Sequence, residues 1–186
     1  MDGPHKRNAT YADVEALPEG KVGQLIDGDL YVSGRPRVRH SAAISGAFAE
    51  IVPAMRGRGP KGWHILFEVE IWFGKSQKNL LVPDLAGWRR ERMLEIPDVQ
   101  TLEIVPDWVC EGLSPSTMRL DKGRKREIYE KHKVGHVWYA DPKNRMLEVL
   151  ELTRGSYRLV TVAMGGQQAV LPPFEHEIDV GRFWRR

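Results

Sequence analysis

The sequence contains a single cysteine, Cys110, among 186 residues. One thiol can form neither an internal disulfide nor a zinc site built from several thiolates. Cys110 lies in the apolar run 108–110, and a free cysteine usually packs as a small buried residue. We therefore expect Cys110 in the hydrophobic core rather than at a reactive site.

Long apolar runs are also missing. No stretch approaches the roughly 20 apolar residues that span a bilayer, and the chain does not open with the basic and apolar regions of a secretory signal. We therefore expect a cytoplasmic protein. Neither an internal repeat nor a long Ser/Gly linker divides the 186 residues, so we predict one domain over residues 1–186, with residues 1–9 flexible.

A large excess of charge is absent as well. The net charge is +3 and the isoelectric point is about 9.0, which does not establish nucleic-acid binding. The cations nevertheless gather in three groups, which are Arg35, Arg37 and Arg39; Arg56, Arg58 and Lys61; and Lys122, Arg124, Lys125, Arg126, Lys131 and Lys133. Each group could bind phosphates through electrostatics that ignore base sequence, or could simply be a solvated face.

The spacing of apolar and turn residues predicts a mixed α/β chain. Helices are expected over residues 10–17, where Thr10 and Asp13 match a capping box, over 41–55 and 119–133, and as a closing turn over 179–184. Strands are expected as a hairpin over 24–32 with its turn at Asp27-Gly28, then over 64–73, 80–88, 107–113 and 135–140, and finally as a pair over 146–152 and 157–162.

Two acidic residues interrupt apolar segments. Asp84 lies within the predicted strand 80–88, and Glu111 ends the apolar run 108–110. A carboxylate in such a place is costly unless it is paired, hydrogen-bonded or bound to a cation. Because Mg²⁺ commonly takes one or two carboxylates together with water and phosphate oxygens, the pair suggests a metal site. For Asp84 the alternative is a side chain that bonds backbone N–H groups in a turn.

A cation on the next predicted helix completes the set. Lys122, Lys125, Tyr129 and His132 recur at helical spacing and share one face. A lysine on that face could orient an attacking water or stabilise charge on a phosphoryl group. Solvated lysines are the alternative, and position alone does not decide between the two.

With these residues in place, the sequence resembles the PD-(D/E)XK nuclease superfamily and, more closely, the bacterial Uma-two family of predicted restriction endonucleases. The matching stretches are residues 24–30, 39–40, 82–84, 111–117, 134–142, and Asp121 with Lys125 and Tyr129. The resemblance implies a restriction-endonuclease-like core, a mixed β-sheet flanked by helices, with extra N- and C-terminal hairpins. It also implies that Asp84 and Glu111 hold Mg²⁺ or Mn²⁺ and that Lys125 is the catalytic lysine.

The match departs from the family pattern at two positions. The superfamily usually places its lysine two residues after the second acid, where this chain has Leu113, so Lys125 would take that role from the next helix. Relatives usually have Glu where this chain has Gln24, and one negative charge fewer should weaken metal binding. Glu50 could replace that acid, although a solvent-facing Glu is the simpler interpretation. His40 would contact a phosphate or hold the start of its helix.

Three functions remain open at this point. The first is a Mg²⁺- or Mn²⁺-dependent endonuclease that hydrolyses DNA, with Lys122 and Tyr129 as possible accessory residues. The second is a catalytically weakened nuclease fold that binds nucleic acid or a partner, which Gln24 favours. The third is an interaction protein whose basic helix 119–133 packs against a partner. By analogy with the superfamily, we expect a homodimer.

Overall fold

The structure, a computed structural model, describes residues 3–57 and 62–184. Arg58 and Lys61 of the second basic group lie outside these residues. The helical elements are α1 (Tyr11–Glu15), α2 (Val38–Met55), α3 (Met118–Leu120), the π-helical turn η2 (Asp121–Lys125), α4 (Arg126–Lys131) and the 3₁₀ turn η3 (Val180–Trp184). Every helix in the described part of the chain is too short or too polar to cross a membrane.

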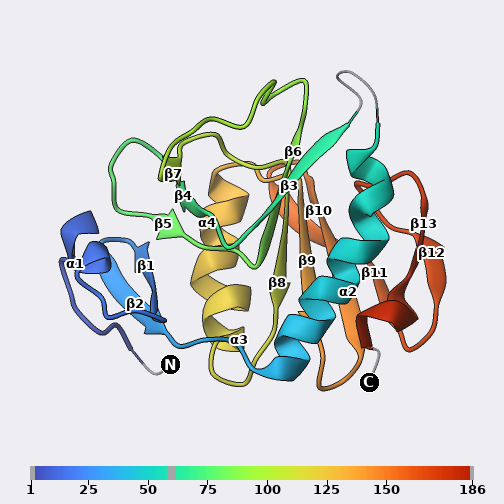
Figure 1. Ribbon diagram of the computed structural model, residues 1–186, viewed down its shortest axis with the longest axis horizontal. Coiled ribbons are helices and arrows are strands. Elements are labelled where there is room, and N and C mark those ends of the chain that lie inside the picture. The colour runs from blue at the N-terminus through green and yellow to red at the C-terminus, as the bar shows by residue number, and fades with distance from the viewer. Residues whose placement is uncertain (1–2, 58–61, 185–186) are drawn as a thin grey trace.

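A six-stranded mixed sheet forms the centre of the molecule (Figure 1). Its strands, in spatial order, are β11 (Ser156–Met164), β10 (Met146–Thr153), β9 (His136–Asp141), β8 (Trp108–Gly112), β6 (Leu85–Arg89) and β3 (Trp63–Phe67). β8 and β9 run parallel, and the other neighbours in this sheet run antiparallel. The predicted mixed α/β class is therefore confirmed.

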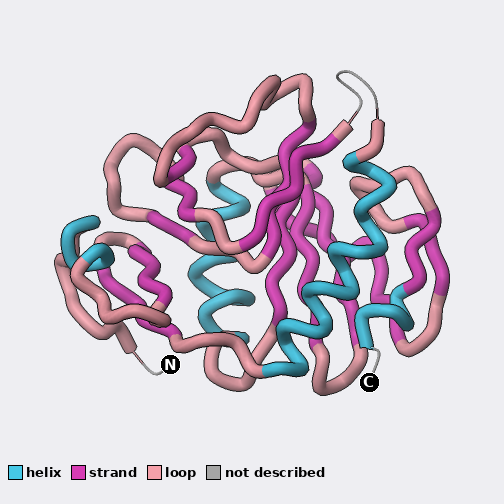
Figure 2. Tube along the Cα trace, viewed as in Figure 1, coloured by secondary structure: helices cyan, strands magenta, loops and turns pink. Residues whose placement is uncertain are grey.

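Two smaller sheets lie beside the central one, and loops connect them to it (Figure 2). The five-stranded sheet contains β2 (Asp29–Ser33), β1 (Val22–Ile26), β5 (Leu80–Leu81), β4 (Glu70–Trp72) and β7 (Thr101–Leu102). The third sheet pairs β12 (Gln168–Val170) with β13 (Glu177–Asp179). The sequence predicted none of β7, β12 and β13, because strands of two or three residues are too short to show an alternating pattern.

The N-terminal elements form as their sequence predicts. Asp13 accepts the backbone N–H of Thr10 at 2.9 Å, as a capping box requires. Asp27 and Gly28 have φ angles of 52° and 85°, the two positive values that a tight type I′ hairpin needs. Residues 5–9 lie along β2: Ala9 is buried, and the His5 N–H donates to the Leu30 carbonyl at 2.7 Å.

Both faces of the central sheet are covered, and alternation along β8 decides which residue faces which side. Trp108 and Cys110 pack with α2 and η3 in one core, which confirms that Cys110 is buried. Val109 packs on the opposite side, in the core that contains Tyr129 of α4. Because Glu111 is two residues from Val109, it shares that face and is directed toward the helix that carries Lys125.

Two predicted strands are broken, and they break beside each other. The segment 64–73 divides into β3 and β4 around Glu68, whose φ is 48°. The segment 80–88 divides into β5 and β6 around Pro83, which has no N–H to donate to a sheet. The Glu68 N–H donates to the Asp84 carbonyl at 3.3 Å. Each chain segment crosses from one sheet to the other here, so Asp84 lies at a junction between sheets rather than within a strand.

Candidate active site

Glu111 is a fully enclosed carboxylate on β8, 2% exposed. One of its oxygens, Oε1, accepts a hydrogen bond from the Tyr129 hydroxyl at 2.5 Å and an ion pair from Lys125 Nζ at 2.7 Å. The other oxygen makes no hydrogen bond or ion pair with the described residues. Glu111 is thus held in place by one oxygen and retains a second for another ligand.

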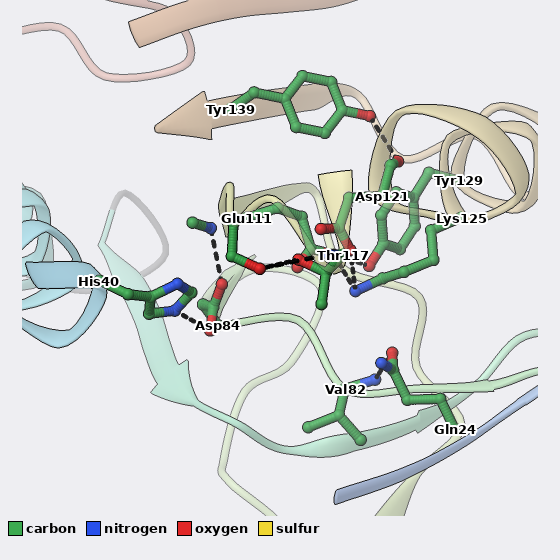
Figure 3. Close-up of polar contacts among 12 residues, drawn as sticks. Gln24, His40, Val82, Asp84, Glu111, Thr117, Asp121, Lys125, Tyr129 and Tyr139 are labelled. Atoms are coloured by element: carbon green, nitrogen blue, oxygen red, sulfur yellow. Dashed lines mark hydrogen bonds and ion pairs between the residues drawn. The ribbon is translucent and has the colours of Figure 1, made fainter. Parts of the chain in front are cut away.

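Lys125 approaches Glu111 from the π-helical turn η2 (Figure 3). The helix predicted over 119–133 is continuous in space but contains this one wider turn, which joins α3 to α4. Lys125 Nζ also lies 3.2 Å from Asp121 Oδ1, one turn earlier. Such π turns occur often at functional sites, and here the turn places an ammonium group, 2% exposed, between two carboxylates.

Asp84 faces the same space from the sheet junction. Its Oδ2 accepts the Gly112 N–H at 2.6 Å, and its Oδ1 lies 2.8 Å from His40 Nε2 (Figure 3). A Cβ atom on Gly112 would come within 2.6 Å of the His40 ring, so glycine is needed for this close approach. Asp84 therefore bonds a backbone N–H of β8 rather than one in a turn of its own segment, and it also lies beside Glu111.

His40 belongs to α2, which begins three residues earlier than predicted. The apolar repeat of Ile44, Phe48 and Ile51 did not extend to it because His40 is polar, although it is four residues before Ile44 and shares its face. The sequence suggested two roles for His40, contact with a phosphate or support of the helix start. The structure adds a third, which is a hydrogen bond to Asp84.

The electrostatics of the site follow from burial. Burial raises the pKa of Glu111 to about 7, with repulsion from Asp121 and Asp84 adding to the rise and the Lys125 ammonium opposing it. Burial by itself would lower the pKa of Lys125, but the charges of Glu111 and Asp121 raise it above its ordinary value. Lys125 is therefore a permanent cation inside the fold, where an isolated charge would be very costly.

Burial and nearby charges also act in opposite directions on the pKa of His40. Burial favours the neutral ring, yet the hydrogen bond to Asp84 and the three nearby carboxylates raise the pKa of His40 above its usual value. The site as a whole thus concentrates three carboxylates around one lysine and one histidine. That leaves negative charge that an added cation would neutralise.

Gln24 lies close to the acidic residues but already has a hydrogen-bond partner. It is 7% exposed, and its Oε1 accepts the Val82 N–H at 2.9 Å (Figure 3). This bond ties β1 to the segment that leads to Asp84. Gln24 therefore has a structural role that does not require a metal, and it still lines the same pocket.

Two of the predicted accessory residues are directed elsewhere. Glu50 accepts the Asp179 N–H at 2.9 Å and pairs with Arg182 at 2.9 Å, so it holds the C-terminal segment against α2. Lys122 pairs with Glu148 at 2.6 Å. Arg124 pairs with Asp27. Three of the six cations of the basic helix, Lys122, Arg124 and Lys125, are thus paired with carboxylates of the protein itself.

A pocket of about 700 Å³ joins these residues. Asp84, Glu111, Asp121 and Lys125 line it, together with Gln24 and His40. The first basic group, Arg35, Arg37 and Arg39, lines the same pocket, as does Lys143 from the turn between β9 and β10. Sequence reasoning missed Lys143, because nothing in residues 142–145 indicates that this turn folds back against the start of α2.

Comparison with known proteins identifies the family and the fold. The family model described as "Uma2: Putative restriction endonuclease" matches residues 10–181. A crystal structure of a "putative nuclease" from Anabaena variabilis ATCC 29413 has a TM-score of 0.74 and 20% sequence identity, and the match covers 94% of this chain and 97% of that one. This likeness concerns the fold. No curated protein matches the chain. Since the family model spans nearly the whole sequence, the chain belongs to the Uma2 family.

Proposed function

We propose that this protein is a metal-dependent endonuclease that hydrolyses phosphodiester bonds of DNA. Asp84 and Glu111 hold Mg²⁺ or Mn²⁺, and Lys125 assists catalysis. The observation that carries the proposal is the convergence of these three side chains in one pocket whose rim is basic. Membership of a family described as restriction endonucleases supports it.

The donor set fits a hard divalent cation. The free oxygen of Glu111 and the two oxygens of Asp84, which have lone pairs beyond their present hydrogen bonds, are carboxylate ligands of the kind that Mg²⁺ takes. Among residues 3–57 and 62–184, no three side chains of His, Cys, Asp or Glu form a complete metal cluster. Mg²⁺ does not need one, because it commonly keeps water and binds substrate phosphate alongside one or two carboxylates.

Each protein group then has a distinct task. A bound metal would stabilise charge on the phosphate and lower the pKa of a water molecule. His40 orients Asp84, and Tyr129 orients Glu111, each through one short hydrogen bond. Lys125, itself 2% exposed, places a fixed positive charge where negative charge develops on the phosphoryl group. The arginines of segment 35–39 attract the DNA backbone.

Nicking of supercoiled plasmid tests this assignment. The wild-type protein should nick the plasmid in the presence of Mg²⁺ or Mn²⁺, and EDTA should abolish this activity. Asp84→Asn should lose roughly 100-fold or more of the activity, because it removes the charge that binds the metal while keeping the shape of the side chain. Asp98→Asn is the matched control: Asp98 also follows a proline but is exposed, and its loss should have no effect.

The same assay distinguishes the endonuclease from the second candidate function, a nuclease fold that binds without cutting. If wild type, Asp84→Asn and Asp98→Asn show equal trace activity, the enzyme assignment fails. A nuclease fold that binds nucleic acid or a partner without cutting then remains. Gln24 favours that alternative, because its amide carries no charge and is already bonded to Val82.

A homodimer is the last part of the proposal. β11 is an edge strand of the central sheet, and several of its apolar side chains are exposed; these are Leu159, Val160, Val162 and Met164. An exposed edge strand with this composition offers unpaired backbone groups and apolar surface to another strand. Two antiparallel copies of β11 can pair about a two-fold axis, which is the usual symmetry of dimers.

A further inference from the structure

A second hollow lies next to the candidate active site. Its volume is about 440 Å³, and residues of the start of α2, the β9–β10 turn and η3 line it. The start of α2 lies at the lower edge of the molecule in Figure 1. It shares Arg39, Pro142 and Lys143 with the active-site pocket. A chain molecule bound in the first pocket can therefore continue directly into the second.

The charge of this hollow is positive. Arg39, Lys143 and Arg145 line it, and no acidic side chain of the described residues does. None of the three forms an ion pair with a carboxylate among the described residues, whereas Lys122, Arg124 and Arg182 all do. Unneutralised cations grouped in this way attract phosphate groups.

The turn that carries two of these cations is held in a fixed conformation. Asp141, 3% exposed, accepts the backbone N–H groups of Lys143 and Asn144 at 2.9 and 3.1 Å, and also the Asn144 side-chain amide at 2.7 Å. The Arg145 carbonyl accepts the Gly165 N–H at 3.1 Å. Asp141 therefore does more than end a strand, because it fixes the direction from which Lys143 and Arg145 leave the turn.

The opposite wall of the hollow is aromatic. Trp184 and Phe183 line it, with their ring centroids 5.5 Å apart. The structure describes all six tryptophans, and five of them are between 0 and 8% exposed. Trp184 is the exception, since it is half-buried. A partly open indole beside three cations is the combination on which single-stranded nucleic acids bind, with the base stacked on the ring and the phosphate held by the cations.

We propose that this hollow binds an unpaired nucleotide of the DNA strand that passes through the active site. Its base stacks on Trp184, and Arg39, Lys143 and Arg145 hold its phosphates. A base inside a duplex is stacked on both sides and cannot offer a face to the indole. The protein therefore prefers single-stranded or frayed DNA over intact duplex. This inference rests on the proposed nuclease function for the nature of the ligand.

Binding measured without cleavage tests it. Fluorescein-labelled oligo(dT) and a duplex of the same length are titrated in EDTA, and fluorescence anisotropy gives Kd. Wild type should bind oligo(dT) more tightly than duplex. Trp184→Ala should weaken oligo(dT) binding roughly 5- to 150-fold and leave duplex binding nearly unchanged. Trp184→Phe, which keeps an aromatic face, should restore most of the loss.

A charge variant with a matched control covers the case in which Trp184→Ala folds poorly. Arg145 and Arg154 are exposed residues in positive-φ turns at the two opposite ends of β10. Arg145→Gln should reduce the slope of log Kd against log salt concentration for oligo(dT) by about 0.7, the value for one lost phosphate contact on a single strand. Arg154→Gln should leave the slope unchanged.

Three results would overturn the inference. They are equal affinity of wild type for oligo(dT) and duplex, an equal effect of Trp184→Ala on both, and equal slopes for Arg145→Gln and Arg154→Gln. Because EDTA prevents cleavage, a protein with no nuclease activity can still show the Trp184-dependent preference. Conversely, an active nuclease whose oligo(dT) affinity ignores Trp184 and Arg145 would disprove this subsite alone.

Discussion

The buried contact between Lys125 and Glu111 predicts a large and non-additive effect on stability. Both residues are 2% exposed, and Lys125 Nζ lies 2.7 Å from Glu111 Oε1 and 3.2 Å from Asp121 Oδ1. Lys125→Met keeps the length of the side chain but leaves two buried carboxylates without their cation. Breaking a buried pair in this way costs about 3–5 kcal/mol. For a chain of this size, that loss lowers Tm by roughly 6–20 °C.

A double-mutant cycle separates the pair from its surroundings. Glu111→Gln should cost about 1–3 kcal/mol, because Asp121 still partners Lys125 and the new amide oxygen can accept the Tyr129 hydroxyl. The double variant should lose about 0.5–3 kcal/mol less than the sum of the single losses, because the second change removes the charge that the first left unpaired. Urea unfolding in EDTA, followed by circular dichroism, gives the free energies of unfolding of wild type, the two single variants and the double variant.

The dependence on pH supplies a further check on the same variant. Burial already raises the folded-state pKa of Glu111 to about 7 from an ordinary value of 4.5, and removing the Lys125 charge raises it further. The folded variant then binds more protons than the unfolded chain, so its stability falls as pH rises. As pH rises from 6 to 9, the free energy of unfolding of Lys125→Met should therefore fall by more than that of wild type.

Lys122→Met is the matched control for the cycle. Lys122 is on the same helix and pairs with Glu148, but its side chain is 32% exposed, so its loss should cost about 0–1 kcal/mol. The reasoning is refuted if Lys125→Met costs no more than Lys122→Met. It is also refuted if the two single losses add to the double loss within about 0.5 kcal/mol.

The remaining predictions concern the metal site and the edge strand. Gln24→Glu restores a negative charge beside the acidic residues and should tighten Mn²⁺ binding about tenfold, because affinity in such sites follows the ligand charge; unchanged or weaker binding in calorimetry would contradict this. Wild type should sediment as a dimer and Val160→Lys as a monomer, since the new charge blocks pairing of β11, whereas Val170→Lys on β12 should stay dimeric. A wild type that sediments as a monomer would rule out the β11 interface.

The composition of the site could be predicted from the sequence, but its contacts could not. A carboxylate in an apolar run must have a partner, so Asp84 and Glu111 stood out from the other acids. The sequence does not distinguish Lys125 from Lys122, because both lie on the same predicted helix face. The fold separates the two lysines: the wide turn η2 directs Lys125 inward to Glu111, while Lys122 reaches Glu148. Local periodicity does not reveal a π turn, since the apolar spacing on either side is unchanged.

The sequence alone determined the features that depend on neighbouring residues. These are the Asp27-Gly28 turn, the Thr10 capping box and the alternation along β8 that sends Cys110 and Glu111 to opposite faces. Tertiary structure decided what depends on distant segments. An apolar run such as 80–88 looks the same whether it stays in one sheet or crosses to another. The hollow that Arg39, Lys143 and Trp184 line together joins segments more than 100 residues apart. Local sequence encodes backbone preference and burial, whereas the partners of each buried charge are set by the packing of the whole chain.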